Sequence, residues 1–307
     1  MHKAAVLLST YNGERYLREQ LDSILAQSGV DLTLYVRDDG SSDRTLDILE
    51  EYRKKHPCIV LNKGENAGVG NSFMQLVYDA PDDFDFYAFS DQDDIWLENK
   101  LIKAVETIKD CKGPVLYTSN QMLVDDQGNE LRLRHASSPG TSYMQILCNN
   151  KLSGCTMVWN NALHKILSDR NRRPSRQMLE KRIHDVWVAM TAAVTGEIVF
   201  DPEAYIMYRQ HEDNVVGVRE TSLRDEWRKK LQRPELRNGR SSLAEEIIRN
   251  EEDLIAHESM VTRLKKYASC NDGIRSKAEV IKEAGYISKY SGEPEMHVIA
   301  KILLGLF

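Results

Sequence analysis

The chain has 307 residues with a 41% hydrophobic share, enough for one large domain with an appendage or for two domains. Its formal net charge of −6 argues against a nucleic-acid-binding protein, because such proteins usually carry a basic surface. The five cysteines are scattered without a CxxC pair, which favours free thiols in a reducing cytoplasm over a disulfide framework or a zinc site.

The first hundred residues alternate between short apolar segments and segments in which apolar residues recur every three or four positions. The predicted strands are residues 4–9, 32–37, 58–62 and 84–90. Each is followed by a segment typical of an amphipathic helix. Four strand–helix units in succession predict an α/β fold with a mostly parallel, Rossmann-like sheet flanked by helices.

The second hundred residues are less regular. Further strands are predicted at residues 114–120, 154–159, 198–200 and 205–209, and helices at 142–148 and 183–194. Residues 124–138 are polar and rich in turn formers, so a connection is expected there.

From about residue 220 the pattern becomes helical and highly charged. One predicted helix carries Leu223, Trp227 and Leu231, and a longer one runs from Leu243 to Leu264. We therefore expect a catalytic domain over 1–217, with halves 1–100 and 101–217, and a helical C-terminal region over 218–307.

The strand predicted at 84–90 ends in four side chains with acceptor oxygens, Asp91, Gln92, Asp93 and Asp94. Carboxylates this close repel one another unless a cation or a hydrogen-bond donor offsets their charge. Oxygen ligands of this kind suit Mg²⁺ or Mn²⁺, and open α/β sheets bind ligands at the carboxyl ends of their strands. The alternative is an acidic surface turn.

The first two predicted strands also end in polar residues. Thr10, Tyr11 and Asn12 offer a hydroxyl, an aromatic face and an amide near a helix N-terminus, which suits a base or an anion. Asp39 is able to accept a hydrogen bond from a pyrimidine imide or a ribose hydroxyl. Both groups are also ordinary turn chemistry.

Residues 64–70 form a glycine-rich connection before the third predicted helix, where a diphosphate could bind. The segment does not match GxGxxG, and no GxxxxGK[ST] occurs in the chain. Both a nicotinamide-dependent dehydrogenase and a P-loop ATPase are therefore disfavoured.

Two residues of the less regular half are candidates for chemistry. Asp185 opens an apolar helix, where a carboxylate either complements the helix dipole or serves as a general base. His211 follows a predicted strand, and a lone histidine is more often a packed or exposed residue. Because Asp91 and Asp93 are already proposed to bind a metal, His211 becomes a candidate to complete the ligand set.

Residues 4–100 resemble glycosyltransferase family 2 with the GT-A fold. The motifs that carry this resemblance are VLLSTYNGERYLREQLDSILAQ, YVRDDGSSDRT, NAGVGNSF and FSDQDDIW. The last of these, with SGCTMVWNNAL, HDVWV and YRQHEDNVVG, is similar to bacterial rhamnosyltransferases that build cell-surface polysaccharides. The resemblance ends at Gly217.

The resemblance implies a role for each motif residue. It assigns the nucleotide to Thr10, Tyr11, Asn12, Glu14 and Asn66, the pyrimidine to Asp39, the ribose to Asp91, the Mg²⁺ or Mn²⁺ ion to Asp93, the ion or diphosphate to His211, and the role of catalytic base to Asp185. The additional Asp94 leaves open which carboxylates touch the ion.

The implied reaction is an inverting transfer of L-rhamnose from dTDP-rhamnose to a hydroxyl of a growing surface polysaccharide or a lipid-linked oligosaccharide. A UDP-hexose donor stays an alternative, because one carboxylate does not distinguish thymine from uracil. A metal-dependent phosphohydrolase would need a nucleophilic Asp after the first strand, where this chain has Ser9 and Thr10. An inactive sugar-binding subunit is disfavoured by Asp93 and Asp185.

The apolar segment 298–307 is too short to span a bilayer. It would either lie in a membrane surface near a lipid-linked acceptor or pack on the catalytic domain or on a second subunit of a homodimer. We expect a cytoplasmic protein, with contact to the inner face of the cell membrane if the segment binds lipid.

Overall fold

The computed structural model describes residues 1–211 and 237–307, which belong to two compact units. The first unit holds residues 1–139, 152–169 and the described residues from Gly196 onward to His211. The second holds residues 140–151, 170–195 and 237–307. The predicted boundary after residue 217, and the helix predicted around Leu223, Trp227 and Leu231, lie outside the described residues.

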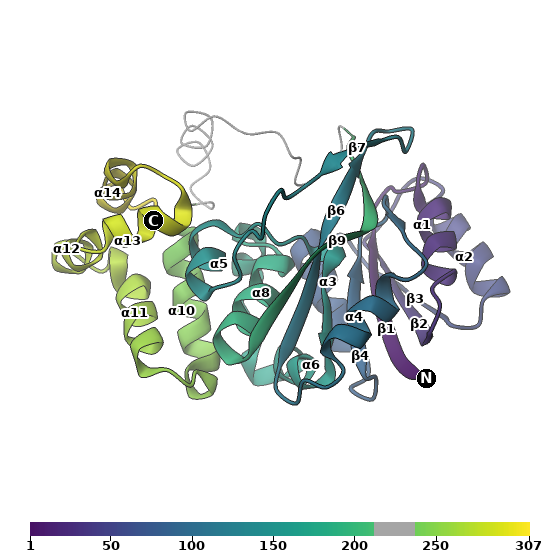
Figure 1. The fold of residues 1–307 in the computed structure, drawn as a ribbon, viewed down its shortest axis with the longest axis horizontal. Helices are drawn as coiled ribbons and strands as arrows, with labels where there is room; N and C mark the ends of the chain where they lie inside the picture. The colour runs from purple at the N-terminus through teal and green to yellow at the C-terminus, as the bar shows by residue number, and fades with distance from the viewer. Residues whose placement is uncertain (212–236) are drawn as a thin grey trace. The chain divides into compact units, whose positions relative to one another are not determined.

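The first unit is built on one sheet (Figure 1). Its strands are β1 (His2–Thr10), β2 (Val30–Asp38), β3 (Ile59–Lys63), β4 (Phe86–Ser90), β5 (Ile95–Trp96), β6 (Val115–Val124), β7 (Glu130–Leu133), β8 (Val158–Asn160) and β9 (Glu197–Arg209). They lie in the order β3-β2-β1-β4-β8-β6-β9-β5, with β7 paired to β6.

The predicted α/β class is confirmed, and the parallel strands are the ones that the strand–helix units supply. β3, β2, β1 and β4 are mutually parallel, whereas β8 runs antiparallel to both β4 and β6. The register pairs Thr10 with Asp38 and Leu8 with Ser90. The residues that follow β1, β2 and β4 therefore meet at one edge of the sheet.

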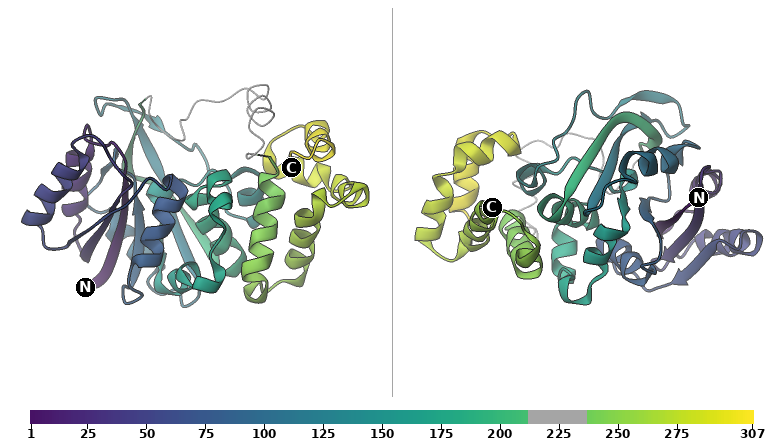
Figure 2. Two further views of the ribbon diagram at one scale, coloured as in Figure 1. Left: turned by 180° about the vertical axis from the view of Figure 1, so that it is seen from behind. Right: turned by 60° about the horizontal axis from the view of Figure 1, so that its bottom comes forward.

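Helices cover both faces of this sheet (Figure 2). They are α1 (Leu17–Leu25), α2 (Thr45–Lys55), α3 (Val69–Asp79), α4 (Lys100–Ile108) and α6 (Asn161–Ser168). On one face, α1, α2 and α4 pack over Val6, Leu8 and Val36, which are fully buried. Burying each such side chain contributes about 1.5–3 kcal/mol.

The other face is covered by α3 and α6 through aromatic contacts. The ring centroids of Phe73 in α3 and Phe89 in β4 are 5.1 Å apart, and Tyr87 stacks on His164 of α6 at 3.6 Å. The central strands β1 and β4 are thus buried on both sides, as their nearly continuous apolar residues predict.

Three expectations for the irregular half are wrong in detail. Only Val158–Asn160 is a strand in the segment predicted at 154–159, because Gly154–Thr156 form a 3-10 turn. The polar connection contains β7, whose residues are all exposed and so show no buried pattern. The two strands predicted near residues 198 and 209 are one strand, β9, with an irregular register near Pro202 that hides its continuity.

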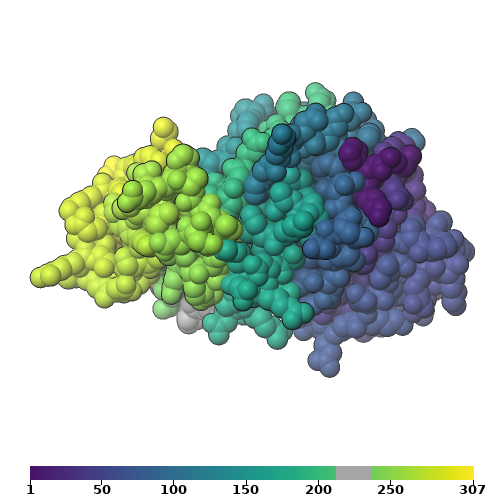
Figure 3. All heavy atoms as spheres, turned by 90° about the horizontal axis from the view of Figure 1, so that it is seen from below, coloured from purple at the N-terminus to yellow at the C-terminus, as the bar shows by residue number. Residues whose placement is uncertain are grey.

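The second unit is helical, and residues 237–307 confirm the expected helical character of that part of the chain. Its helices are α5 (Tyr143–Asn149), α7 (Arg176–Lys181), α8 (His184–Thr195), α10 (Gly239–Glu251), α11 (Glu258–Ala268), α12 (Ile274–Ile281), α13 (Ala284–Ser291) and α14 (Glu295–Leu303). Figure 3 shows the atoms of α10 to α14 in green and yellow. None of the helices in the described ranges is long and apolar enough to cross a membrane.

The single long helix predicted from Leu243 to Leu264 is wrong. The chain leaves the helix after Glu251, makes a 3-10 turn at Glu252–Leu254 and resumes at Glu258. Ile255, in extended conformation between the two helices, is buried. The apolar pattern therefore continues across the break, and periodicity alone does not reveal it.

Candidate functional site

Asn12 and Glu14 join the loop after β1 to the loop after β2. The backbone N–H of Asn12 donates to Ser41 Oγ at 2.9 Å, and Asn12 Oδ1 accepts from the Ser42 N–H at 2.8 Å. Glu14 Oε2 accepts from the Arg44 N–H at 2.9 Å. These two predicted nucleotide-binding residues therefore also shape the edge of the sheet.

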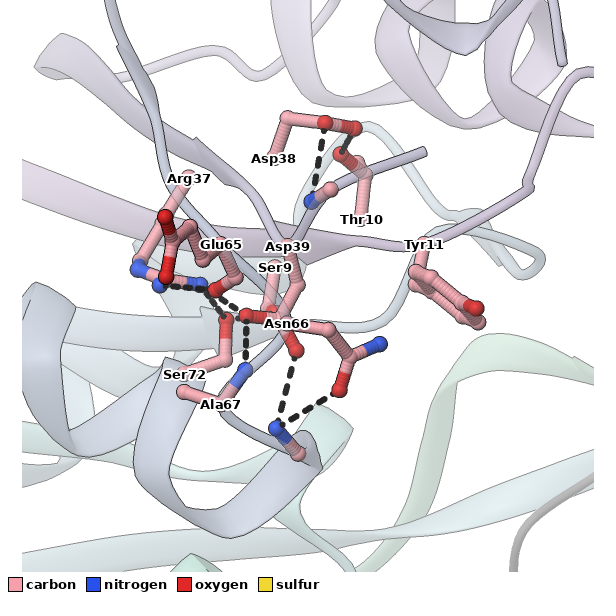
Figure 4. Close-up of polar contacts among 12 residues, drawn as sticks. Ser9, Thr10, Tyr11, Arg37, Asp38, Asp39, Glu65, Asn66, Ala67 and Ser72 are labelled. Carbon is pink, nitrogen blue, oxygen red and sulfur yellow. Dashed lines mark hydrogen bonds and ion pairs between the residues drawn. The ribbon is translucent and has the colours of Figure 1, made fainter. Parts of the chain in front are cut away.

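Asp38, the last residue of β2, stabilises the loop that follows this strand. Its buried carboxylate accepts from the Thr10 hydroxyl at 3.1 Å (Figure 4). The same oxygen accepts from the Ser41 hydroxyl at 2.6 Å. The N–H groups of Gly40 and Ser41 donate to its other oxygen. Thr10, a predicted nucleotide ligand, thus directs its hydroxyl into the protein.

Asp39 closes the glycine-rich loop onto β2. The N–H groups of Ala67 and Gly68 donate to its two oxygens at 2.9 and 3.0 Å, and Arg37 forms an ion pair with it. Asn66 Oδ1 accepts from the same Gly68 N–H at 3.2 Å. A carboxylate has about four lone-pair sites, so a contact from Asp39 to a pyrimidine would use the capacity that these donors leave.

Arg37 is a residue of this edge that the sequence analysis missed. Its guanidinium donates to Ser72 Oγ at 2.9 Å and to the Glu65 carbonyl at 3.0 Å, besides its ion pair with Asp39 (Figure 4). A methyl group at Gly64 would collide with it. The available signal was a basic residue next to the last position of the strand, directly before Asp38 and Asp39.

Gln92, between the acidic residues, binds the backbone of Tyr11. Its Oε1 accepts from the Tyr11 N–H at 2.9 Å, and its Nε2 donates to the Tyr11 carbonyl at 3.1 Å. A methyl group at Gly13 would collide with this carboxamide. The Tyr11 ring is half exposed and lies to one side of the Asp39 network (Figure 4).

The acidic cluster, formed by Asp91, Asp93 and Asp94, is close to the buried Cys155. Ligand atoms of Asp91, Asp94 and Cys155 are within 4.8 Å of one another. Asp94 is almost fully buried and accepts from the Arg209 N–H at 3.2 Å. Burial, with the charges of Asp93 and Asp91, holds the pKa of Asp94 well above its ordinary value.

Lys100 is a buried cation that interacts with Asp94 and Cys155. It is buried, and its Nζ lies 3.6 Å from the centroid of the Trp96 ring. Burial lowers the pKa of Lys100 to about 7, partly offset by Cys155 and Asp94. Its ammonium form reduces the repulsion between the carboxylates, and it opposes a second cation beside Asp94.

Asp93 and His211 are in direct contact. Asp93 Oδ2 and His211 Nε2 are 2.9 Å apart, although the residues are 118 positions apart in the chain. The Asp93 side chain keeps 19% of its surface exposed, so one side remains open to water or phosphate. A carboxylate and an imidazole are donors that suit Mn²⁺, and a carboxylate with water and phosphate suits Mg²⁺. The residues present therefore fit a divalent ion.

Asp185 lies in the second unit, in the first turn of α8. Its Oδ1 accepts from the Val186 N–H at 2.7 Å, and its side chain is partly exposed. The neighbouring His184 is buried, which lowers its pKa to about 3 and keeps its ring neutral. The remaining predicted site residues all belong to the first unit: Thr10, Tyr11, Asn12, Glu14, Asp39, Asn66, Asp91, Asp93 and His211.

The geometry of the first unit gathers a loop network at the ends of β1 and β2 and a carboxylate–imidazole pair after β4 and β9. Such an arrangement has the elements needed to hold a nucleoside diphosphate with a divalent ion. The individual roles assigned to these residues stay predictions.

Residues 5–167 match the family Glycosyl transferase family 2. The chain is 31% identical over 221 residues to the dTDP-rhamnosyl transferase RfbG of Shigella flexneri, which covers 68% of this chain and 73% of that protein. It is 28% identical over 156 residues to an uncharacterized glycosyltransferase of Nostoc sp., covering 48% of this chain and 44% of that protein.

The fold has solved counterparts. The structure of S. aureus TarS 1-349 in complex with UDP-GlcNAc superposes with a TM-score of 0.61 at 18% identity, covering 99% of this chain and 89% of that one. At this identity the likeness concerns the fold alone, and it confirms the predicted GT-A architecture. With the family match extending over more than half of its length, the chain belongs to glycosyl transferase family 2.

Proposed function

We propose that this glycosyltransferase moves L-rhamnose from dTDP-rhamnose to a hydroxyl of a growing surface polysaccharide or a lipid-linked oligosaccharide. The observation that carries the proposal is the similarity to a dTDP-rhamnosyl transferase over two thirds of the chain. The acidic residues Asp91, Asp93 and Asp94 lie within the family match at residues 5–167. A UDP-hexose is the second candidate donor, because one carboxylate at the pyrimidine imide does not distinguish thymine from uracil.

In this proposal the edge of the sheet binds the nucleotide. Tyr11 offers an exposed ring to the base, and Asn12, Glu14 and Asn66 form the surrounding loops. Asp39 accepts a hydrogen bond from the pyrimidine imide through its remaining lone pairs. Asp91 contacts the ribose.

Asp93 and His211 would hold Mg²⁺ or Mn²⁺. A divalent ion at this position supplies Lewis-acid stabilisation of the charge that develops on the departing diphosphate. Asp94 is buried near Cys155 and Lys100, so it would stabilise the loop and would not bind the ion, which Asp93 and His211 would hold.

Asp185 is the proposed general base of an inverting displacement. Its carboxylate removes the proton from the acceptor hydroxyl while that oxygen bonds to the anomeric carbon and the bond to the diphosphate oxygen breaks. General-base catalysis contributes about 10²–10⁴-fold to such a step. The partly exposed side chain is compatible with access by an acceptor.

The acceptor proposal gives the C-terminal segment a role. Val298, Ile302 and Phe307 are buried within the second unit, whereas Leu303 and Leu304 are exposed. The segment thus packs on protein through one face, and its other face is free for the inner surface of the cell membrane or a second subunit. A cytoplasmic enzyme working on a lipid-linked acceptor would use the membrane contact.

The decisive test is turnover by purified protein with a panel of nucleotide sugars, with release of the nucleoside diphosphate as the signal. Release from dTDP-rhamnose that requires Mn²⁺ or Mg²⁺ is the expected result. Asp185→Asn should keep donor binding and lose transfer by about 10²-fold or more. A variant that turns over like the wild type removes Asp185 from the mechanism, and transfer that survives a chelator contradicts the metal role.

A further inference from the structure

The pair formed by Asp93 and His211 joins two segments that are remote in the sequence. Two residues before His211, at the end of β9, stands Arg209, with only 3% of its surface exposed. A long cationic side chain is rarely buried to this degree unless its donors are matched by acceptors.

The acceptors of Arg209 include the loop that carries the acidic cluster. Its Nε donates to the backbone carbonyl of Asp93 at 3.1 Å, and its backbone N–H donates to Asp94 Oδ1 at 3.2 Å. Its Nη1 donates to the Asp126 carbonyl at 2.9 Å, and its Nη2 pairs with Glu19 Oε2 at 2.5 Å. One guanidinium therefore ties the acidic loop to α1 and to the turn after β6.

The same guanidinium supports the histidine through an aromatic ring. Its central carbon lies 4.7 Å from the centroid of the Tyr16 ring, and that ring lies 5.2 Å from the ring of His211. The Tyr16 hydroxyl donates to the carboxylate of Asp126, and burial with this hydrogen bond raises the pKa of Tyr16 to about 12. Tyr16 is thus a fixed neutral surface against which the imidazole packs.

We propose that Arg209 is a positioning residue that presets Asp93 and His211 for a divalent ion bound with a nucleoside diphosphate. The proposal rests on the function proposed above. Arg209 touches neither the ion nor the substrate in this role; it fixes the backbone of one ligand and the packing surface of the other. Lysine is not an equivalent, because a single ammonium group cannot reproduce the planar fork that reaches separate acceptors.

The test is the Mn²⁺ concentration needed for half-maximal binding of dTDP, with UDP in parallel, in wild type and in Arg209→Lys. Loss of groups that orient metal ligands typically costs about 10–100-fold in metal affinity, so a shift of this size is expected. Weak dTDP binding without metal should be unchanged, and transfer should recover at saturating Mn²⁺. These results together would show that the variant needs more Mn²⁺ although its nucleotide pocket is intact.

Arg240→Lys is the matched control. Arg240 is also buried and donates to the Cys148 carbonyl while pairing with Glu293, but it belongs to the second unit. Its substitution should lower the melting temperature without changing the Mn²⁺ dependence. An equal shift in both variants would mean that the effect is general destabilisation, which overturns the proposal.

An Arg209→Lys protein with the wild-type Mn²⁺ dependence also overturns it. If that variant does not fold, Glu19→Gln decides, since it weakens one anchor of the guanidinium from a half-exposed position. A smaller shift in the same direction supports the proposal, and an unchanged Mn²⁺ dependence rejects it. A wild-type protein that binds neither nucleotide with Mn²⁺ rejects the proposed function itself, independently of Arg209.

Discussion

Glu251 is a carboxyl group held between two helices of the second unit. One oxygen accepts from the Thr191 hydroxyl of α8 at 2.7 Å, and the side chain is 1% exposed. Burial is the main cause that raises the pKa of Glu251 to about 8, opposed by that hydrogen bond and by Arg172. The folded protein therefore carries a neutral glutamic acid at neutral pH.

This has a measurable consequence for stability. In the unfolded chain the carboxyl ionises near 4.5, so between about pH 4.5 and 8 the folded state binds the extra proton. The free energy of unfolding should then fall as pH rises, by at most about 1.4 kcal/mol per pH unit from this group. Glu251→Gln keeps the acceptor for Thr191 and removes the titration.

The measurement is urea unfolding of wild type and Glu251→Gln across pH 5 to 8, the range between the two pKa values. The difference between the proteins isolates Glu251, because His184 and the other titrating groups contribute equally to both. The free energy of unfolding of Glu251→Gln should increase relative to that of the wild type as pH rises. A difference that stays constant with pH would show that Glu251 ionises normally.

The role of a side chain was predictable where the residue belongs to a recognisable motif. It was not predictable where the role depends on partners that the fold brings near. The sequence marks Asp93 and His211 as ligand types, and the fold brings them within 2.9 Å. It does not reveal that the oxygens of Asp39 are engaged by Arg37 and by two backbone amides, since those donors come from a loop whose path depends on tertiary packing.

At the scale of elements, α14 is apolar on more than the face it buries. Met296 and Leu303 are 71% and 56% exposed, and Leu304, directly after the helix, is 60% exposed, whereas Val298 and Ile302 of α14 are fully buried. Exposed apolar side chains gathered on one short helix suit an interface with lipid or protein.

If the membrane contact is real, Leu303→Ser with Leu304→Ser should reduce sedimentation with vesicles containing phosphatidylglycerol. Burying a leucine contributes about 1.5–3 kcal/mol, so losing two should weaken partition by more than about tenfold. Leu131→Ser, at an exposed leucine of β7, is the control and should leave partition unchanged. Wild-type protein that does not sediment with the vesicles would remove the membrane proposal.

The elements of the first hundred residues were predictable because β1 and β4 are buried on both faces, β2 is buried mainly at alternate positions, and each helix is buried on one face. Continuous apolar runs and helical spacing follow directly from that burial. β7 was not predictable, since its four residues are exposed, and neither was the break after Glu251, where Ile255 keeps the apolar pattern in a non-helical conformation.

For the whole molecule, donor choice is the property that the family leaves open. A ligand that binds only the folded state stabilises it by about 2.7 kcal/mol at one hundred times its dissociation constant. We expect dTDP with Mn²⁺ to raise the melting temperature more than UDP with Mn²⁺ at the same concentration, and both shifts to shrink with EDTA. A larger shift with UDP would favour a UDP-hexose as donor.

Fold and family could be predicted at this scale because the motifs lie in chain order along a repeated strand–helix pattern. The grouping of α5, α7 and α8 with the C-terminal helices could not. It depends on which buried surfaces match, and their residues, although apolar, carry no signal of their partner.

The two hydrogen bonds between the Gln92 side chain and the main chain of Tyr11 have a practical consequence for protein engineering. Since the carboxamide holds peptide groups and no side-chain atom of Tyr11, a library at position 11 changes the half-exposed ring without removing either hydrogen bond. If Tyr11 contacts the nucleobase as proposed, directed evolution of base preference can begin at this position, with glycine retained at position 13.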